Sequence, residues 1–247
     1  MWAVGDAAGG RPAAREVGRL ISRGPRDRLA YLGDVYETGT AEEYERNYAP
    51  VFGSLAPRTI PTPGNHEWPN RAEGYDAYWS RVFGRSQPPW FSMRLGGWQI
   101  LSLNSEAEHA PGSPQLSWLH GQLAEPGDCR LAIWHRPRWS AGRRHGDQPD
   151  VAPLWDALPG RARVVVNAHE HDMQRFRPID GITQLVSGAG GQGLYRIDRP
   201  DRRLAFADDE QYGALRMELR PGSLSFSFIA VDGRVLDSGR VACRQAK

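Results

Sequence analysis

Short apolar stretches of this chain repeatedly end in a polar residue that can bind a metal ion. Trp2–Gly5 leads directly into Asp6, and Leu29–Gly33 leads directly into Asp34. Short apolar runs bounded by turn residues are typical of buried strands. The polar residues that close five such stretches are Asp6, Asp34, Asn65, His135 and His169. Because ligands in open α/β sheets bind beyond the carboxyl ends of strands, we expect these side chains to meet at one rim.

Strand and helix patterns alternate through the first two-thirds of the chain. Apolar residues recur at helical spacing from Ala13 to Ile21, and Ala41–Phe52 shows a similar pattern. Ser113-Pro114 supplies an N-cap and a first-turn proline for a further helix. Apolar and polar residues alternate in the tail segments Leu215–Leu219, Leu224–Val231 and Val235–Val241. Asp232-Gly233 is a hairpin signal between the last two, so we predict α/β units followed by an antiparallel meander.

The composition is that of one ordinary globular domain. The 247 residues suffice for one substantial core, and no repeat or low-complexity linker divides them, so we expect a single domain over residues 1–247. The balance of 31 basic and 29 acidic residues is too even to indicate nucleic-acid or anionic-membrane binding. No apolar run is long enough to span a bilayer, and no signal-peptide pattern is present, which leaves the localisation open.

The two cysteines, Cys129 and Cys243, lie too far apart to form a metal-knuckle motif. They are compatible with one disulfide bond or with two free thiols, and the sequence leaves both alternatives open.

Five ordered motifs resemble those of the calcineurin-like metallophosphoesterase superfamily. They are Gly5-Asp6, Gly33-Asp34, Gly64-Asn65-His66-Glu67, the lone His135, and His169-Glu170-His171. Further segments look most like the purple acid phosphatase branch and its bacterial relatives, namely Gly39-Thr40, Ser113-Pro114-Gln115, Trp134-His135-Arg136-Pro137 and Tyr212-Gly213. The resemblance runs nearly end to end. Each motif alone is a weak signal, whereas the ordered set is specific.

The resemblance implies a four-layer α/β/β/α sandwich with two central mixed β-sheets. It implies hydrolysis of phosphate monoesters by attack of a metal-bound hydroxide at a binuclear centre. The cofactors would be two divalent or mixed-valence ions of iron, zinc or manganese, and the partner would be a small phosphorylated substrate. One alternative is a phosphodiesterase that acts on cyclic or other nucleotides with the same site. Another is a degenerate, non-catalytic binding protein on the same scaffold.

The resemblance also implies a role for each motif residue. The implied ligands of the first metal are Asp6, Asp34 and His171. Those of the second metal are Asp34, Asn65, His135 and His169. Asp34 would bridge the two ions and offset their repulsion. His66 would protonate the leaving group or donate a hydrogen bond to the phosphate, and Glu67 would orient its ring.

Two positions depart from the pattern of the superfamily. Ala8 occupies the place of a metal-binding histidine in the first motif. Purple acid phosphatases also lack that histidine and use a tyrosine three residues after the bridging aspartate. Here Tyr36 lies two residues after Asp34, and Glu37 lies three after it. Either side chain, or water, would complete the first metal's ligands, and ligation by Tyr36 would favour ferric iron.

Four other residues receive secondary assignments. We regard His145 as a candidate for substrate contact, because related bacterial sequences look similar there. Arg175 follows the double-histidine motif, and we favour a supporting or packing role for it over substrate contact. His109 and His120 are expected at the surface.

Overall fold

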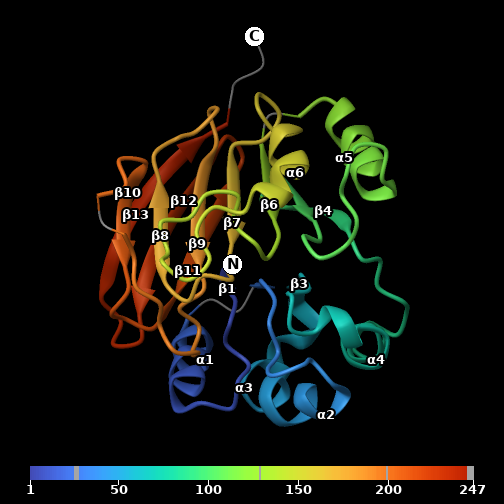
Figure 1. Cartoon of the computed structure of the whole chain (residues 1–247), viewed down its shortest axis with the longest axis vertical. Helices are drawn as coiled ribbons and strands as arrows, with labels where there is room; N and C mark the ends of the chain where they lie inside the picture. Colours follow the sequence, from blue (N-terminus) through green and yellow to red (C-terminus); the bar gives the residue numbers. More distant parts are fainter. Residues whose placement is uncertain (25–27, 128, 199, 244–247) are drawn as a thin grey trace.

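The computed structural model of the chain describes residues 1–24, 28–127, 129–198 and 200–243. Two mixed β-sheets pack face to face, and helices cover the outer face of each sheet (Figure 1). The predicted four-layer α/β/β/α sandwich is therefore confirmed. None of the helices in these ranges is long and apolar enough to cross a membrane.

The first sheet joins the start of the chain to its tail. Its strands are β1 (Trp2–Val4), β2 (Leu29–Tyr31), β3 (Thr59–Pro61), β11 (Gly213–Arg220), β12 (Ser223–Ala230) and β13 (Val235–Ala242). Their order is β13-β12-β11-β1-β2-β3. β1, β2 and β3 are parallel, and their register places Val4, Tyr31 and Pro61 side by side at the carboxyl ends. β11 runs antiparallel to β1 and begins the predicted meander.

The second sheet is built from the middle of the chain. Its strands are β4 (Phe91–Leu95), β5 (Trp98–Ser102), β6 (Arg130–Ile133), β7 (Val164–Asn167), β8 (Met173–Phe176), β9 (Thr183–Ser187) and β10 (Leu204–Asp208). Their order is β10-β8-β9-β7-β6-β5-β4. β5, β6, β7 and β9 are parallel, and the other strands pair antiparallel. Ile133 and Val166 are paired near the carboxyl ends of β6 and β7.

The helical segments form two separate groups. The first group contains α1 (Pro12–Arg23), α2 (Ala41–Glu43), η1 (Tyr44–Tyr48), α3 (Ala49–Phe52), η2 (Gly53–Arg58), η3 (Trp68–Asn70), η4 (Ala72–Asp76) and α4 (Ala77–Phe83). The second group contains α5 (Pro114–Ala124), η5 (Pro149–Val151) and α6 (Ala152–Asp156). Helices α1 to α4 gather at the bottom of Figure 1, and α5 and α6 lie at its upper right.

Three apolar clusters hold the four layers together. The central cluster lies between the sheets and includes Leu32, Ile133 and Phe228. A second cluster packs α1, η1, α3 and α4 on the first sheet, and a third packs α5 and α6 on the second sheet. The parallel strands β1, β2, β3, β6, β7 and β9 are buried on both faces, which explains why they are predominantly apolar runs.

The predicted helices mostly agree with the structure. The Ser113 hydroxyl accepts a hydrogen bond from the Leu116 N–H, as expected of an N-cap. The segment Ala41–Phe52 is continuously helical, but its centre η1 is a π-helical stretch. Strands β4, β8 and β10 and helix α4 were not predicted. β4 and β10 lie at sheet edges and are only partly buried, so their apolar signal is weak.

A disulfide bond joins Cys129 to Cys243 and resolves the alternative that the sequence left open. Cys129 immediately precedes β6 in the second sheet, and Cys243 immediately follows β13 in the first. The bond therefore connects the two sheets covalently across a separation of 114 residues.

Candidate metal centre

The five polar residues predicted at strand ends lie together at one rim of the two sheets. Each follows a parallel strand within a few residues: these strands are β1, β2 and β3 of the first sheet and β6 and β7 of the second. The first sheet thus supplies Asp6, Asp34 and Asn65, and the second supplies His135 and His169. The carboxyl ends of parallel strands open toward the same side, so two facing sheets deliver ligands to one place.

The backbone at this rim is unusual. Asp6, Asp34 and His169 have φ values of 56°, 68° and 69°, in the left-handed region that residues other than glycine rarely adopt. Such conformations concentrate at functional sites, where the surrounding fold enforces them. A Cβ atom on Gly64 would lie 2.1 Å from Oδ1 of Asp34, and one on Gly188 would lie 1.9 Å from the Glu170 carbonyl. Both glycines therefore permit close backbone approach around the rim.

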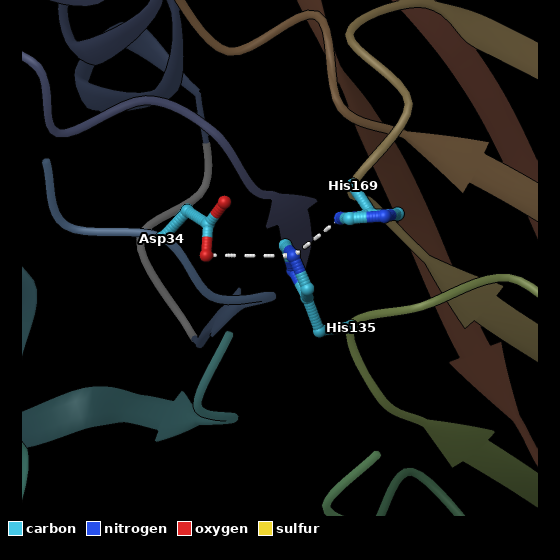
Figure 2. Close-up of side chains that lie close together, drawn as sticks. All are labelled: Asp34, His135 and His169. Carbon is cyan, nitrogen blue, oxygen red and sulfur yellow. Dashed lines mark hydrogen bonds and ion pairs between the residues drawn. The ribbon is translucent and has the colours of Figure 1, made fainter. Parts of the chain in front are cut away.

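His135 is the centre of one group of donor atoms. Its Nε2 lies 3.1 Å from Asn65 Oδ1, 3.1 Å from His169 Nδ1 and 3.4 Å from Asp34 Oδ1. Figure 2 shows how the Asp34 and His169 side chains converge on the His135 ring. The Nδ1 atom of His135 donates to the Leu32 carbonyl, 2.7 Å away. This second hydrogen bond fixes the ring and directs Nε2 into the group, as in metal-binding histidines.

The spacing of this donor group suits a metal ion. Ligands about 2.0–2.2 Å from a tetrahedral ion lie ~3.3–3.6 Å from one another, close to the distances around His135 Nε2. Without a metal the group needs a proton instead. Burial opposes that proton, but the Asp34 carboxylate raises the pKa of His135 to about 10. Burial and the charge of His135 hold the pKa of His169 well below its usual value. The group thus favours one positive charge at its centre, which is the environment that a metal cation requires.

A second group of donor atoms surrounds the Tyr36 hydroxyl. Its oxygen lies 2.9 Å from Asp6 Oδ1, 3.0 Å from Asp34 Oδ2 and 3.0 Å from His171 Nε2. The Nδ1 atom of His171 donates to the Gly193 carbonyl, so in the neutral ring its Nε2 is an acceptor directed into the group. One hydroxyl proton cannot serve three acceptors. Burial and the charges of the two aspartates raise the pKa of Tyr36, and a cation among these atoms would reverse that effect.

The loop between β2 and α2 determines whether Tyr36 or Glu37 reaches the group of donor atoms that includes Asp6 and His171. The Tyr36 N–H donates to the Ala8 carbonyl, and Ala8 also forms an isolated β-bridge with Val35. This pairing draws Tyr36 toward Asp6. The neighbouring Glu37 is exposed, and its carboxylate makes no hydrogen bond or ion pair with any described residue. The structure therefore brings Tyr36, and not Glu37, to the first group.

Asp34 belongs to both groups of donor atoms. Its Oδ1 faces His135 and accepts a hydrogen bond from the His66 N–H, whereas its Oδ2 faces the Tyr36 hydroxyl. Burial raises the pKa of Asp34, but His135 and His66 together lower it below its ordinary value. A single ionised carboxylate with one oxygen in each group is the geometry that a bridging ligand requires.

The expectation that Glu67 orients the His66 ring is wrong. The buried Glu67 carboxylate accepts hydrogen bonds from the backbone N–H groups of Asp34, Val35 and Gly64, at 3.0–3.1 Å. Burial and the charge of Asp34 raise the pKa of Glu67 to about 8, against the effect of these hydrogen bonds. Adjacent side chains in a tight turn diverge, so Glu67 points inward and holds the loop of Asp34 instead.

His66 is held by a different partner. Its Nδ1 donates to the Glu37 carbonyl at 2.5 Å, and its ring centre lies 4.3 Å from that of Tyr36. The side chain is 31% exposed, and its Nε2 lies 3.8 Å from Asp34 Oδ2. The free ring nitrogen is thus directed to the edge of the two donor groups, where a bound substrate would meet it.

His145 and Tyr195 lie beside the imidazoles of the cluster. The His145 ring packs on His169 with centres 4.1 Å apart, and Tyr195 stacks on His171 at 3.9 Å. Burial and the charge of His171 lower the pKa of His145 to about 4. His145 therefore lies beside the candidate site, and its contact with a substrate stays a prediction. Tyr195 was missed, because it lies in an irregular segment that carries no motif.

The remaining secondary assignments agree with the structure. Arg175 forms a two-pronged ion pair with Asp237 and packs over Phe226, which is a structural role. His120 is exposed, and His109 is partly exposed, with both ring nitrogens bonded to backbone carbonyls. None of these residues contacts the two donor groups.

Comparison with known sequences identifies relatives over most of the chain. A profile of the family described as Calcineurin-like phosphoesterase matches residues 1–173. Tartrate-resistant acid phosphatase type 5 of Mus musculus is 26% identical over 268 residues, which cover 90% of this chain and 81% of that protein. Probable purple acid phosphatase 20 of Arabidopsis thaliana is 25% identical over 189 residues, or 64% of this chain and 44% of the relative.

Solved structures share the fold. A Plasmodium protein titled GAP50, the anchor in the inner membrane complex, matches with a TM-score of 0.83 at 12% identity, over 100% of this chain and 89% of that chain. A purple acid phosphatase from seeds of yellow lupin (Lupinus luteus) matches with a TM-score of 0.77 at 17% identity, over 97% of this chain and 52% of that chain. At these identities the likeness concerns the fold alone.

Proposed function

This chain belongs to the calcineurin-like phosphoesterase family, and from that premise we propose that it hydrolyses phosphate monoesters at a binuclear metal centre. The proposal rests on the position of Asp34, whose Oδ1 belongs to the group around His135 and whose Oδ2 belongs to the group around the Tyr36 hydroxyl. A mononuclear site would need only one of these groups. The acid phosphatase names of its relatives favour a monoester substrate.

The proposed ligands follow the two groups. The first metal would be held by Asp6, Asp34, Tyr36 and His171. The second metal would be held by Asp34, Asn65, His135 and His169. The phenol of Tyr36 favours a hard trivalent ion such as ferric iron at the first position, and the imidazoles favour zinc, iron or manganese at the second. When bound, the two ions would supply positive charge that acidifies a water molecule and offsets the charge of the phosphoryl oxygens.

The protein's own groups shape the site around that charge. Asn65 offers a neutral oxygen, so the second group contains a single carboxylate and keeps more of the metal's positive charge for the substrate. Asp6 is fixed by the His169 N–H, which donates to its Oδ2 at 2.9 Å. Asp34 is fixed by the Glu67 carboxylate through its own N–H. Preorganised ligands of this kind need little rearrangement during the reaction.

His66 is the proposed proton donor to the leaving oxygen. Its Nδ1 hydrogen is committed to the Glu37 carbonyl, so only the imidazolium form carries a hydrogen on the outward Nε2. That hydrogen would pass to the alkoxide or phenoxide as the ester bond breaks. Proton transfer from a positioned side chain contributes about 10²–10⁴-fold to such reactions.

Paired substrates test the proposal. We expect the metal-loaded protein to hydrolyse p-nitrophenyl phosphate faster than bis-p-nitrophenyl phosphate, and a chelator to abolish both activities. A preference for the diester would favour the phosphodiesterase alternative. Fewer than one metal per chain after reconstitution, together with no turnover of either substrate, would favour a non-catalytic binding protein.

A further inference from the structure

The loop that carries His145 is anchored firmly at the edge of the candidate metal centre. We name residues 140–148 the rim loop. The N–H groups of His145 and Gly146 donate to the buried Glu170 carboxylate at 2.9 and 2.8 Å. The Ser140 N–H donates to Asp147, and the Ala141 N–H donates to the buried Gln174. These bonds fix the backbone on either side of the loop's two arginines.

The rim loop is also tied to the segment that carries Tyr195. The Arg143 N–H donates to the Arg196 carbonyl at 2.8 Å, and the Asp198 N–H donates to the Ala141 carbonyl at 2.7 Å. Gly142 and Ile197 form an isolated antiparallel bridge between the two segments. The loop and the aromatic ring therefore form one positioned unit.

The two adjacent arginines of the rim loop differ in their partners. Arg143 forms an ion pair with Asp198, at 2.6 Å. Arg144 is exposed and makes no hydrogen bond or ion pair with any residue that the structure describes. Its guanidinium carbon lies 5.8 Å from the centre of the Tyr195 ring. Among the described residues Arg144 is thus a positive charge without a carboxylate partner, and the adjacent Arg143 is a matched control.

Arg144 lies close to the candidate metal centre. The Tyr195 ring beside it stacks on His171, 3.9 Å away, and His171 belongs to the group around the Tyr36 hydroxyl. The distance from the guanidinium carbon to the centre of the His171 ring therefore cannot exceed the sum of two distances. These are the distance from that carbon to the Tyr195 ring centre and the distance between the Tyr195 and His171 ring centres. Arg136, near the same cluster, is already paired with Glu106 at 2.9 Å. The charge of Arg144 remains available to a ligand.

We propose that Arg144, positioned by the rim loop above the Tyr195 ring, binds a second phosphate group carried by the leaving group of the substrate. This subsite rests on the proposed function, since the scissile phosphate would lie at the metal centre. A guanidinium suits the assignment because its planar fork binds phosphate oxygens in pairs. The preferred substrates would be bisphosphates whose two monoester groups are separated by a short spacer.

The reaction at such a substrate is ordinary ester hydrolysis. Water adds its oxygen to the scissile phosphorus, and the bond from that phosphorus to the ester oxygen breaks. The leaving alcohol keeps its ester oxygen, gains one proton and retains the second phosphate. No oxidant, reductant or further reactant is consumed.

Matched alkyl substrates test Arg144. We would measure kcat and KM of the metal-loaded protein for propane-1,3-diyl bisphosphate and for 3-hydroxypropyl phosphate. Loss of a charged contact predicts that Arg144→Ala lowers kcat/KM for the bisphosphate about 10- to 100-fold, mainly through KM. The simple monoester should change less than about threefold. Arg143→Ala should leave both substrates unaffected.

Three outcomes would overturn the subsite. One is an equal loss on both substrates, which would place Arg144 at the scissile group or in the fold. Another is no loss on either substrate. The third is that Arg144→Ala lowers kcat/KM for 4-phosphooxybutanoate as much as for the bisphosphate. The second anion of that substrate is a carboxylate, so the subsite would then not be specific for phosphate.

A binding measurement separates this inference from the proposed function. Calorimetry of the metal-loaded protein with propane-1,3-bisphosphonate and with propylphosphonate requires no turnover. The bisphosphonate should bind more tightly, and Arg144→Ala should remove the difference. If the wild-type protein shows this difference but hydrolyses no ester, the proposed function fails and the subsite stands. If it hydrolyses monoesters but shows no difference, only the subsite fails.

Discussion

Replacement of Tyr36 by phenylalanine should weaken the first metal site and leave the second intact. The substitution removes the oxygen that lies within 3.0 Å of Asp6, Asp34 and His171, and it keeps the ring that packs on His66. Loss of an outer-sphere partner typically costs 10–100-fold in metal affinity, so loss of a direct ligand should cost at least about that much. The second group does not contain Tyr36 and should keep its metal.

The same substitution has a calculable effect on the metal-free protein. A hydrogen bond to a charged group contributes about 1.5–3 kcal/mol, and each kcal/mol shifts the melting temperature of a chain of this size by roughly 2–4 °C. Metal-free Tyr36→Phe should therefore melt about 3–12 °C lower than the metal-free wild type.

Metal analysis during titration with a competing chelator is the assay. For Tyr36→Phe we expect one tightly held metal per chain, against two in the wild type, and loss of any phenolate-to-iron absorption band. Tyr195→Phe removes a hydroxyl from the ring that stacks on His171, keeps that stacking, and should retain both metals. Glu37→Gln should also retain both metals. Equal weakening of both sites by Tyr36→Phe, or a loss in Glu37→Gln alone, would refute the assignment.

Three further predictions concern the support of the site and the fold. His66→Ala should lower kcat about 10²–10⁴-fold for p-nitrophenyl phosphate and retain both metals, and loss of metal in this variant would show that its role is misassigned. Glu67→Gln replaces one of two acceptor oxygens with an amide nitrogen that cannot accept from the backbone N–H groups of Asp34, Val35 and Gly64, so it should cost about 1–3 kcal/mol of unfolding free energy in urea and lower kcat, whereas an unchanged variant would remove Glu67 from the support of Asp34. Replacement of Cys129 and Cys243 by serine should cost about 4–5 kcal/mol in the chain-entropy model, and reductant should no longer affect the variant. A cost near zero would exclude the bond as a stabilising element.

The residue pattern was sufficient for the α/β units, the antiparallel tail and the residues that converge at the rim, whereas the four layers were implied by the family resemblance. Apolar runs end in Asp6, Asp34 or His135 because the parallel strands before these residues are buried on both faces. Such runs are visible in the order of the residues. The convergence of these residues follows from the direction of the strands. The assignment of metals to them remains a proposal, because distances alone do not identify an ion.

Other features of the site depend on contacts that no local pattern encodes. The choice between Tyr36 and Glu37 rests on the hydrogen bond from Tyr36 to the Ala8 carbonyl, across two loops. The Glu67 assignment was wrong because its carboxylate reaches the backbone of a distant loop and not the adjacent ring. Tyr195 reaches His171 only through the folding of an irregular segment.

The binuclear centre is tested most directly by anomalous diffraction from crystals of the metal-loaded protein. A binuclear centre bridged by Asp34 predicts two metal peaks about 3.5–4 Å apart, with one oxygen of Asp34 coordinated to each. It also predicts that Asp34→Asn crystals lose at least one of the two peaks. A single peak in the wild type, or two peaks that do not share Asp34, would contradict the binuclear centre.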